Sequence, residues 1–178
     1  MINVTNYGGQ NWLITPAALA VNQTPPSSII DQKWLLVLSG VGICNFKGQT
    51  TNDWSKDTVY INPDVLGPIN WAIAQFSIPT PPQTPPWYPA FQVEEWSPFA
   101  TINSIFDQNE SINAGFAIDD WRAAPFIEGY DIITDSIIGN IFDGINVDAA
   151  VRDSDAWIYR VGYNITLLGK IKFLGAPE

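Results

Sequence analysis

The sequence predicts an all-β fold: an antiparallel β-sandwich or jelly roll or, as the alternative, a small closed β-barrel, with at most one or two short helices. Two features of the whole chain favour strands. Charged residues make up only 15% of the chain, which is too few to cover the solvent-facing sides of several helices. Short apolar segments rich in isoleucine and aromatic residues are separated by turn-forming residues, which is typical of about eight to ten short strands.

The third feature is an alternating pattern over residues 157–173. Odd positions are almost all apolar and even positions are mostly polar, as in a strand with one face in the core and one in water. A straight strand of this length would span about 60 Å, whereas a compact domain of this size is about 40 Å across. We therefore expect a bend at Gly162 or a turn at Gly169. Tyr159 and Tyr163 should line either a solid core or a pocket.

Further strands follow from the same reasoning. They are expected at residues 10–15, 33–46, 58–61, 69–78, 91–105, 111–121 and 145–151. Residues 33–46 are apolar on both faces, which predicts a central strand buried on both sides. Pro98 should either interrupt its strand or mark a sheet edge. Residues 99–106 and 111–121 flank a clear turn, so they should pair as a β-hairpin. Residues 132–142 predict either a short helix or short strands.

The remaining segments are expected to be loops. Residues 16–32 should hold only a helical turn after Pro16, and residues 47–57 should form a polar loop. Half of residues 79–90 are proline, which predicts a stiff extended segment that serves as a crossover, a lid or an arm to a neighbouring subunit. The whole chain, residues 1–178, is expected to be a single domain.

Charge and residue usage exclude several functional classes. The formal net charge is −10, so a basic footprint for nucleic acid or for an anionic membrane surface is missing. There is no histidine, which excludes Ser-His-Asp and Cys-His catalytic systems and histidine-ligated metal sites. The single cysteine, Cys44, is expected to be a buried, inert thiol. No signal peptide is recognisable, so we expect a cytoplasmic protein by default, or a secreted one if a leader has been removed.

A calcium site is one candidate. Asp143, Asn146, Asp148, Asp153 and Asp155 supply hard oxygen ligands at alternating spacing, and calcium needs six to eight such oxygens. The spacing is not that of an EF-hand loop. Aspartate and asparagine are also common turn residues, which gives an ordinary structural explanation for the same cluster.

A ring-binding surface is the second candidate. The chain has 8 tryptophans, and exposed indole faces stack on sugar rings while nearby polar groups bind hydroxyls. Several aromatic residues lie in or beside polar or proline-rich segments: Trp54, Trp87, Tyr88, Trp96 and Trp121. By contrast, Trp34, Trp71 and Trp157 lie within strand patterns and are expected in the core.

Carboxylate catalysis is the third candidate. Glu94 and Glu95, and likewise Asp119 and Asp120, are adjacent pairs on expected strands, so one member of each pair should point inward. An inward acid beside an aromatic residue could have a raised pKa and act as a general acid or base.

These candidates define three functional hypotheses. The leading one is a non-enzymatic β-sandwich binding module, lectin-like, that takes a glycan or another small molecule. No cofactor is expected for it, with calcium as the alternative. The second is a structural, self-assembling protein, capsid-like or inclusion-forming, or a homo-oligomer. The third is a small β-barrel enzyme, a cyclase or hydrolase that uses one inward carboxylate.

Overall fold

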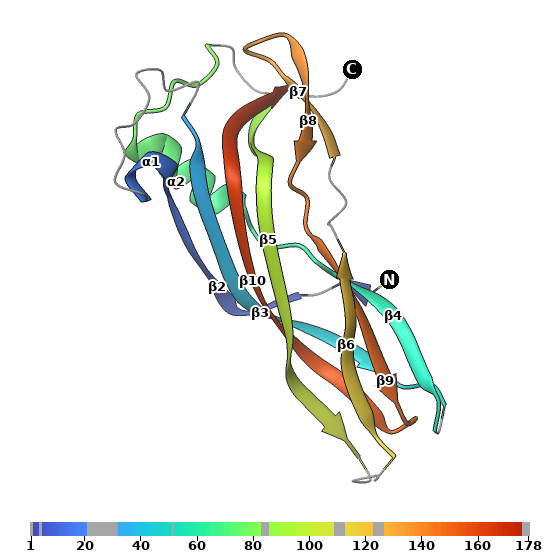
Figure 1. Ribbon diagram of the computed structural model, residues 1–178. Helices are drawn as coiled ribbons and strands as arrows, with labels where there is room; N and C mark the ends of the chain where they lie inside the picture. The colour runs from blue at the N-terminus through green and yellow to red at the C-terminus, as the bar shows by residue number, and fades with distance from the viewer. Residues whose placement is uncertain are drawn as a thin grey trace.

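The computed structural model describes residues 2–3, 5–20, 32–50, 52–82, 86–108, 113–122 and 127–175. Most of this part of the chain is strand (Figure 1). The strands are β1 (Ile2–Asn3), β2 (Thr5–Pro16), β3 (Trp34–Lys47), β4 (Trp54–Ile61), β5 (Trp87–Asp107), β6 (Gly115–Arg122), β7 (Ile127–Asp131), β8 (Ser136–Ile141), β9 (Ile145–Arg152) and β10 (Ala156–Gly175). Two helices accompany them, α1 (Ala17–Ala20) and α2 (Leu66–Gln75). The all-β prediction is confirmed.

The strands form two sheets. The larger has the order β2-β3-β10-β5-β8-β7, and the smaller has the order β1-β4-β9-β6. Strand β7 also pairs with β10, where Leu174 lies opposite Asp131. This contact closes the larger sheet on itself through β10, β5, β8 and β7, so the chain contains the small β-barrel that was the alternative prediction.

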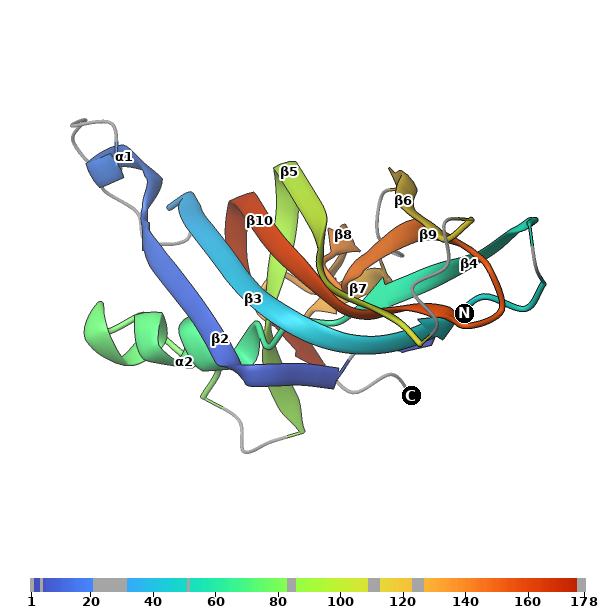
Figure 2. The same ribbon diagram turned by 90° about the horizontal axis from the view of Figure 1, so that it is seen from below.

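Strand β10 is the central strand of the molecule. It pairs antiparallel with β3 on one side and with β5 on the other along most of its 20 residues. Val161, Tyr163, Ile165 and Leu167 are buried, as the alternating pattern predicts. The strand curves strongly (Figure 2), which confirms the expected bending. The alternative, a turn at Gly169, is wrong, because pairing continues through that residue to Gly175.

The alternating pattern fails at the beginning of β10. The register shifts between Ile158 and Arg160 against both neighbouring strands: β10 has the extra residue against β5, whereas β3 has the extra residue against β10. Across this β-bulge the buried side chains of β10 change from even to odd positions. Ile158 is therefore fully buried, whereas Tyr159 is exposed and Trp157 is only partly buried. The expected core position of Trp157 is wrong for this reason.

One face of the larger sheet carries the hydrophobic core. Helix α2 covers one end of this face, and the smaller sheet covers the other end (Figure 2). At the α2 end, the ring of Trp34 contacts the ring of Phe76 at 5.1 Å between centroids. At the other end, Phe46 and Val147 belong to the same buried cluster. Tyr163 is buried and packs directly over Gly40, because its hydroxyl lies 2.5 Å from where a Cβ on Gly40 would be.

Residues 69–78 were expected to be a strand, and this prediction is wrong: Leu66–Gln75 is helix α2. Ile69, Ala72 and Phe76 recur at helical spacing and pack on the core, as one face of an amphipathic helix does. Pro68 lies in the first turn, where a missing N–H breaks no helical hydrogen bond. The β-branched isoleucines favoured a strand, and the tertiary packing of the apolar face outweighs that preference.

The expected hairpin of residues 99–106 with 111–121 is also wrong. Strand β6 pairs with β9 in the smaller sheet, with Gly115 opposite Arg152, whereas β5 pairs with β10 in the larger sheet. The turn therefore carries the chain from one sheet to the other. Strand β5 runs unbroken through Pro98, which lies opposite Ile165. Among the described strands, only β10 pairs with this part of β5, so the edge interpretation of Pro98 is confirmed.

Several other segments can be compared with their predicted structure. Residues 47–57 are only partly a loop, because β4 already begins at Trp54. Residues 33–46 form most of β3, which has a neighbouring strand on each side as predicted. Only one of its faces is buried, however, and the other is half-exposed. Cys44 is buried as expected, and burial raises the pKa of its thiol. The expected helical turn after Pro16 and the short-strand alternative within residues 132–142 are confirmed by α1 and β8. Residues 83–85 of the proline-rich segment lie outside the described residues, and its last four residues open β5.

Candidate functional site

The five aromatic residues singled out from the sequence do not share one surface. Trp54 is exposed at the start of β4, and Tyr88 is exposed at the start of β5, at opposite ends of the molecule (Figure 1). Trp87 packs edge-on against Phe173 at 5.4 Å between ring centroids. Trp96 is partly buried against the core. Trp121 lies in β6, and its side chain is outside the described part of the structure.

The first pair of acids, Glu94 and Glu95, does not alternate as expected. The register between β5 and β10 shifts at Leu168 and Gly169, so β5 has an extra residue there and Glu94 and Glu95 are both exposed. The carboxylate of Glu94 forms an ion pair with the ammonium group of Lys33 at 2.5 Å, and this contact raises the pKa of Lys33. Asp119 and Asp120 lie in β6 beside a second register shift, and their side chains are outside the described residues. A catalytic role for these four acids stays a prediction.

The five predicted calcium ligands are distributed along β9. Asp143 precedes this strand, and Asp153 and Asp155 follow it, so the two groups lie at its opposite ends. Asp148, within the strand, accepts a hydrogen bond from Thr58 at 2.8 Å. Within the described part of the chain, no three acidic or cysteine side chains are grouped so as to hold a metal ion. Calcium binding stays a prediction.

An exposed tryptophan pair lies where α2 meets β2. The rings of Trp12 and Trp71 are 5.6 Å apart between centroids and inclined at 57°. Both indoles are large and apolar, yet 41% of Trp12 and 44% of Trp71 remain exposed to solvent. Their mutual inclination makes an open aromatic corner on the surface, built from one strand and one helix.

A chain of ring contacts fixes this corner to the core. Trp71 contacts Phe76 at 6.2 Å, and Phe76 in turn contacts the buried Trp34 at 5.1 Å. Trp12 lies on the same side of β2 as Ile14, which is buried. Trp71 is therefore connected to the core through Phe76, and Trp12 contacts Trp71, so a ligand would meet two indoles that are already positioned.

Polar groups adjoin the pair. Gln10, two residues before Trp12 on the same face of β2, donates from Nε2 to the carbonyl oxygen of Asp64 at 2.6 Å and accepts from the hydroxyl of Tyr163 at 3.1 Å. The Asp64 carboxylate accepts from the backbone N–H groups of Leu66 and Gly67 at 2.9 and 3.2 Å. This bonding caps the first turn of α2. Desolvation raises the pKa of Tyr163 to about 12, so its hydroxyl stays a donor at neutral pH.

Sequence reasoning missed this pair for an identifiable reason. Trp71 was placed in the core because its segment was interpreted as a strand, and Trp12 attracted no attention in a short alternating strand. The helical spacing of Ile69, Ala72 and Phe76 was the available signal. It would have put Trp71 on the outer part of a helix.

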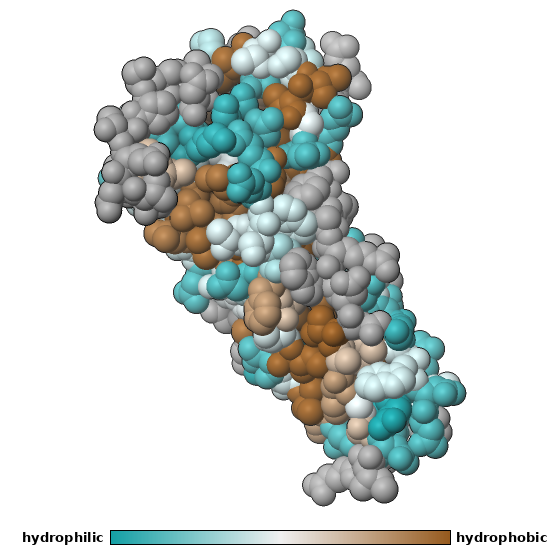
Figure 3. Space-filling model, in the orientation of Figure 1, coloured by the Kyte–Doolittle hydropathy of each residue, from teal (hydrophilic) through white to brown (hydrophobic). Residues whose placement is uncertain are grey.

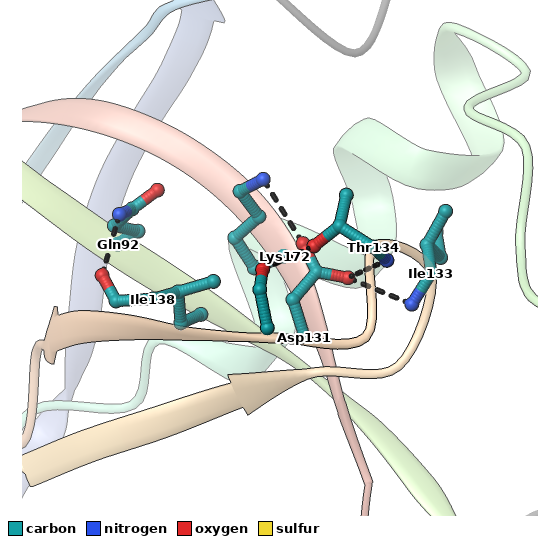
Figure 4. A network of polar contacts seen from close by, with 7 residues as sticks. Gln92, Asp131, Ile133, Thr134, Ile138 and Lys172 are labelled. Atoms are coloured by element: carbon teal, nitrogen blue, oxygen red, sulfur yellow. Dashed lines mark hydrogen bonds and ion pairs between the residues drawn. The ribbon is translucent and has the colours of Figure 1, made fainter.

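A second polar group is structural. Asp131 is buried at the seam between β7 and β10, and its carboxylate lies 3.0 Å from the ammonium group of Lys172 (Figure 4). The same carboxylate accepts from the N–H groups of Ile133 and Thr134 at 2.8 and 3.2 Å. Burial, the largest single influence, raises the pKa of Asp131, but these hydrogen bonds together outweigh it and lower the pKa. The Asp131–Lys172 ion pair therefore links β7 to β10 at the point where the barrel closes.

No protein-family model, curated protein or solved structure matches this chain. Neither helix in the described part of the chain is long and apolar enough to cross a membrane.

Proposed function

We propose that this chain is a non-enzymatic binding module and that the Trp12–Trp71 corner takes a ring of a neutral glycan. The observation that carries the proposal is that two indoles held by the core remain more than two-fifths exposed. Burying a tryptophan side chain is strongly favourable, so leaving two adjacent indoles in water has a cost in stability that a binding role explains.

The chemistry of the corner fits a sugar better than a charged ligand. Indole faces stack on the C–H groups of a sugar ring, while exposed amide and carboxylate groups nearby bind its hydroxyls. Asp64 and Asn70 are exposed neighbours of the two tryptophans in space or in sequence. With a net charge of −10, the protein repels anionic ligands at long range, whereas a neutral glycan meets no such penalty.

The test is binding of the wild-type chain and of Trp71→Ala to an array of immobilised neutral oligosaccharides. We expect the wild type to retain at least one class of glycan and Trp71→Ala to bind it at least about tenfold more weakly, the loss typical of a central aromatic anchor. Trp54→Ala is the matched control, because it removes an equally exposed indole at the other end of the molecule. Retention by Trp71→Ala at wild-type strength, or no glycan bound by the wild type, would contradict the proposal.

Self-assembly is the second candidate, and strand β2 favours it. Strand β2 is an edge of the larger sheet, and none of its 12 residues is charged. Natural edge strands usually carry lysine or other charges that prevent pairing with another chain. Large apolar side chains also reach the surface at several places, seen as separate brown areas in Figure 3. On an acidic chain, an uncharged edge is where a second copy meets least repulsion.

Sedimentation velocity tests this candidate. Pairing of β2 between two copies predicts a dimer for the wild type and a monomer for Leu13→Lys, which places a charge beside the edge. Ile137→Lys is the control, since Ile137 is the more exposed of the two, at 69%, and lies on β8 away from β2. A monomeric wild type at high micromolar concentration would remove self-assembly through β2.

A further inference from the structure

The lower part of β5 is a second open edge of the larger sheet. Strand β10 pairs with one side of β5 along its whole length. Strand β8 pairs with the other side only where Ile141 lies opposite Gln92, near the upper end of β5 in Figure 1. Over Phe99–Phe106, β10 is the only described strand that pairs with β5. The backbone groups on the other side of this stretch can therefore pair with an added strand.

This edge lacks the charges that usually protect one. No residue from Trp96 to Phe106 is charged, whereas natural edge strands usually carry lysine or other charges that prevent pairing with another chain. Pro98 has no N–H to donate, so it protects the edge only above Phe99. The stretch Phe99–Phe106 below it is long enough for an ordinary strand to pair with it.

Two isoleucines of this stretch belong to the core face of the sheet but are not fully covered. Ile102 lies opposite Val161 and Ile105 lies opposite Ile158, and both partners are fully buried. Paired residues of adjacent strands point to the same face, yet Ile102 is only partly buried and Ile105 is 51% exposed. Apolar side chains of an added strand would cover them, which adds hydrophobic stabilisation to the backbone hydrogen bonds.

The spacing of the two isoleucines predicts the pattern of the added strand. The register of β5 against β10 shifts between Ile102 and Ser104, so β5 has one extra residue, Asn103. A β-bulge places two residues opposite one on a neighbouring strand. A regular strand would therefore meet Ile102 and Ile105 with residues two positions apart, which point to the same face. This geometry fits a partner with alternating apolar residues.

The charges at the two ends of the stretch indicate the rest of the chemistry. All charged residues of β5 are acidic: Glu94 and Glu95 precede the stretch, and Asp107 follows it. If two copies of the chain paired antiparallel and symmetrically over residues 96–106, Glu95 of each copy would lie opposite Asp107 of the other, and like charges directly opposite are destabilising. A segment with a basic residue at each end has the complementary arrangement, and the net charge of −10 attracts it at long range.

We infer that β5 binds an extended segment of another protein as an added β-strand along Phe99–Phe106. The segment has alternating apolar residues, which cover Ile102 and Ile105, and lysine or arginine at both ends. Backbone hydrogen bonds hold the segment, and its alternating side chains determine the register. This interaction goes beyond the proposed function, because its partner is a protein and β5 lies two strands away from β2, which carries Trp12.

Isothermal titration calorimetry with a short synthetic peptide tests the inference. The peptide alternates threonine and valine, has lysine at each end and is capped at both termini. We expect it to bind, and we expect the same peptide with proline in place of a central valine to bind at least about tenfold more weakly, because proline cannot donate a backbone hydrogen bond. Ile105→Lys should weaken binding of the valine peptide at least about tenfold, since it removes an apolar contact and repels the lysines. Ile137→Lys is the matched control, because it makes the same change at an exposed isoleucine of β8.

Amide hydrogen exchange locates the bound peptide. Exchange should slow at least about tenfold within Phe99–Phe106 and stay unchanged in β2, the other open edge of the sheet. No heat with the valine peptide, equal binding of both peptides, equal weakening by Ile105→Lys and Ile137→Lys, or protection of β2 alone would overturn the inference. A wild-type dimer that Ile105→Lys dissociates would also overturn it, because a second copy would then occupy this edge. Trp71→Ala should leave peptide binding unchanged, so failure of this inference and failure of the proposed function are distinguishable.

Discussion

Replacing Lys172 with methionine is expected to lower the free energy of unfolding by about 3 kcal/mol, because it leaves the buried carboxylate of Asp131 without its counter-charge. Asp131 is 2% exposed, and its ion pair with Lys172 lies where β7 closes the barrel on β10. The measurement is urea denaturation at pH 7. The double variant Asp131→Asn with Lys172→Met removes both charges, so it should recover part of the loss.

Lys170→Met is the control for this prediction. Lys170 lies two residues away on the same face of β10, and no buried acid depends on it in the described contacts. Its replacement should change the free energy of unfolding by less than about 1 kcal/mol. Equal losses for Lys170→Met and Lys172→Met would mean that the ion pair does not hold the seam.

The effect of Lys172→Met should also depend on pH. The folded-state pKa of Asp131 is lowered, so its contribution to stability is present above the unfolded value of about 3.9 and is lost as the pH falls through the folded value. In Lys172→Met, burial without the counter-charge raises that pKa. The difference in stability between wild type and variant should therefore be largest near neutral pH and shrink in acid.

The second large effect is expected for Gly169→Ala. A Cβ on Gly169 would lie 1.9 Å from the carbonyl oxygen of Gln92, a backbone atom of the neighbouring strand. The two strands must separate where their register shifts, and we expect a loss of about 3 kcal/mol in the free energy of unfolding. Thermal and urea denaturation measure it.

Gly162→Ala is the matched control on the same strand. A Cβ there would meet only the side-chain ends of Thr101 and Asn103, at 3.0 and 3.1 Å, and these can move aside. The loss should stay below about 1 kcal/mol. If both alanine variants were equally stable, the close approach of β10 to β5 at Gly169 would be contradicted.

The fold class follows from local patterns, and the places where prediction fails have definite physical causes. The alternating pattern over residues 161–167 predicts the buried side chains correctly, because β10 is regularly paired there on both sides. It fails at Trp157 and Tyr159 because a bulge inserts one residue. On β3, opposite this bulge, Asn45 has a φ of 49°. Bulges depend on the partner strand as well as on the strand itself, so the sequence of one strand does not reveal them.

The candidate site could not be predicted from local sequence patterns, for a related reason. Trp12 and Trp71 come from segments far apart in the chain and meet only because α2 packs across β2. The same pattern of isoleucine and alanine fits a strand or a helix when the segment is short. Predicted sites built from neighbours in sequence, such as the acids flanking β9, were separated by the length of a strand.

The most direct test of the proposed function is a titration followed by the tryptophan indole N–H signals in nuclear magnetic resonance. A panel of soluble neutral hexasaccharides would be added to protein labelled with nitrogen-15, after assignment of the signals by single substitutions. We predict that one glycan shifts the signals of Trp12 and Trp71 together and leaves that of the buried Trp34 in place. Shifts confined to Trp54 or Trp87, or no shift with any member of the panel, would contradict glycan binding at the Trp12–Trp71 corner.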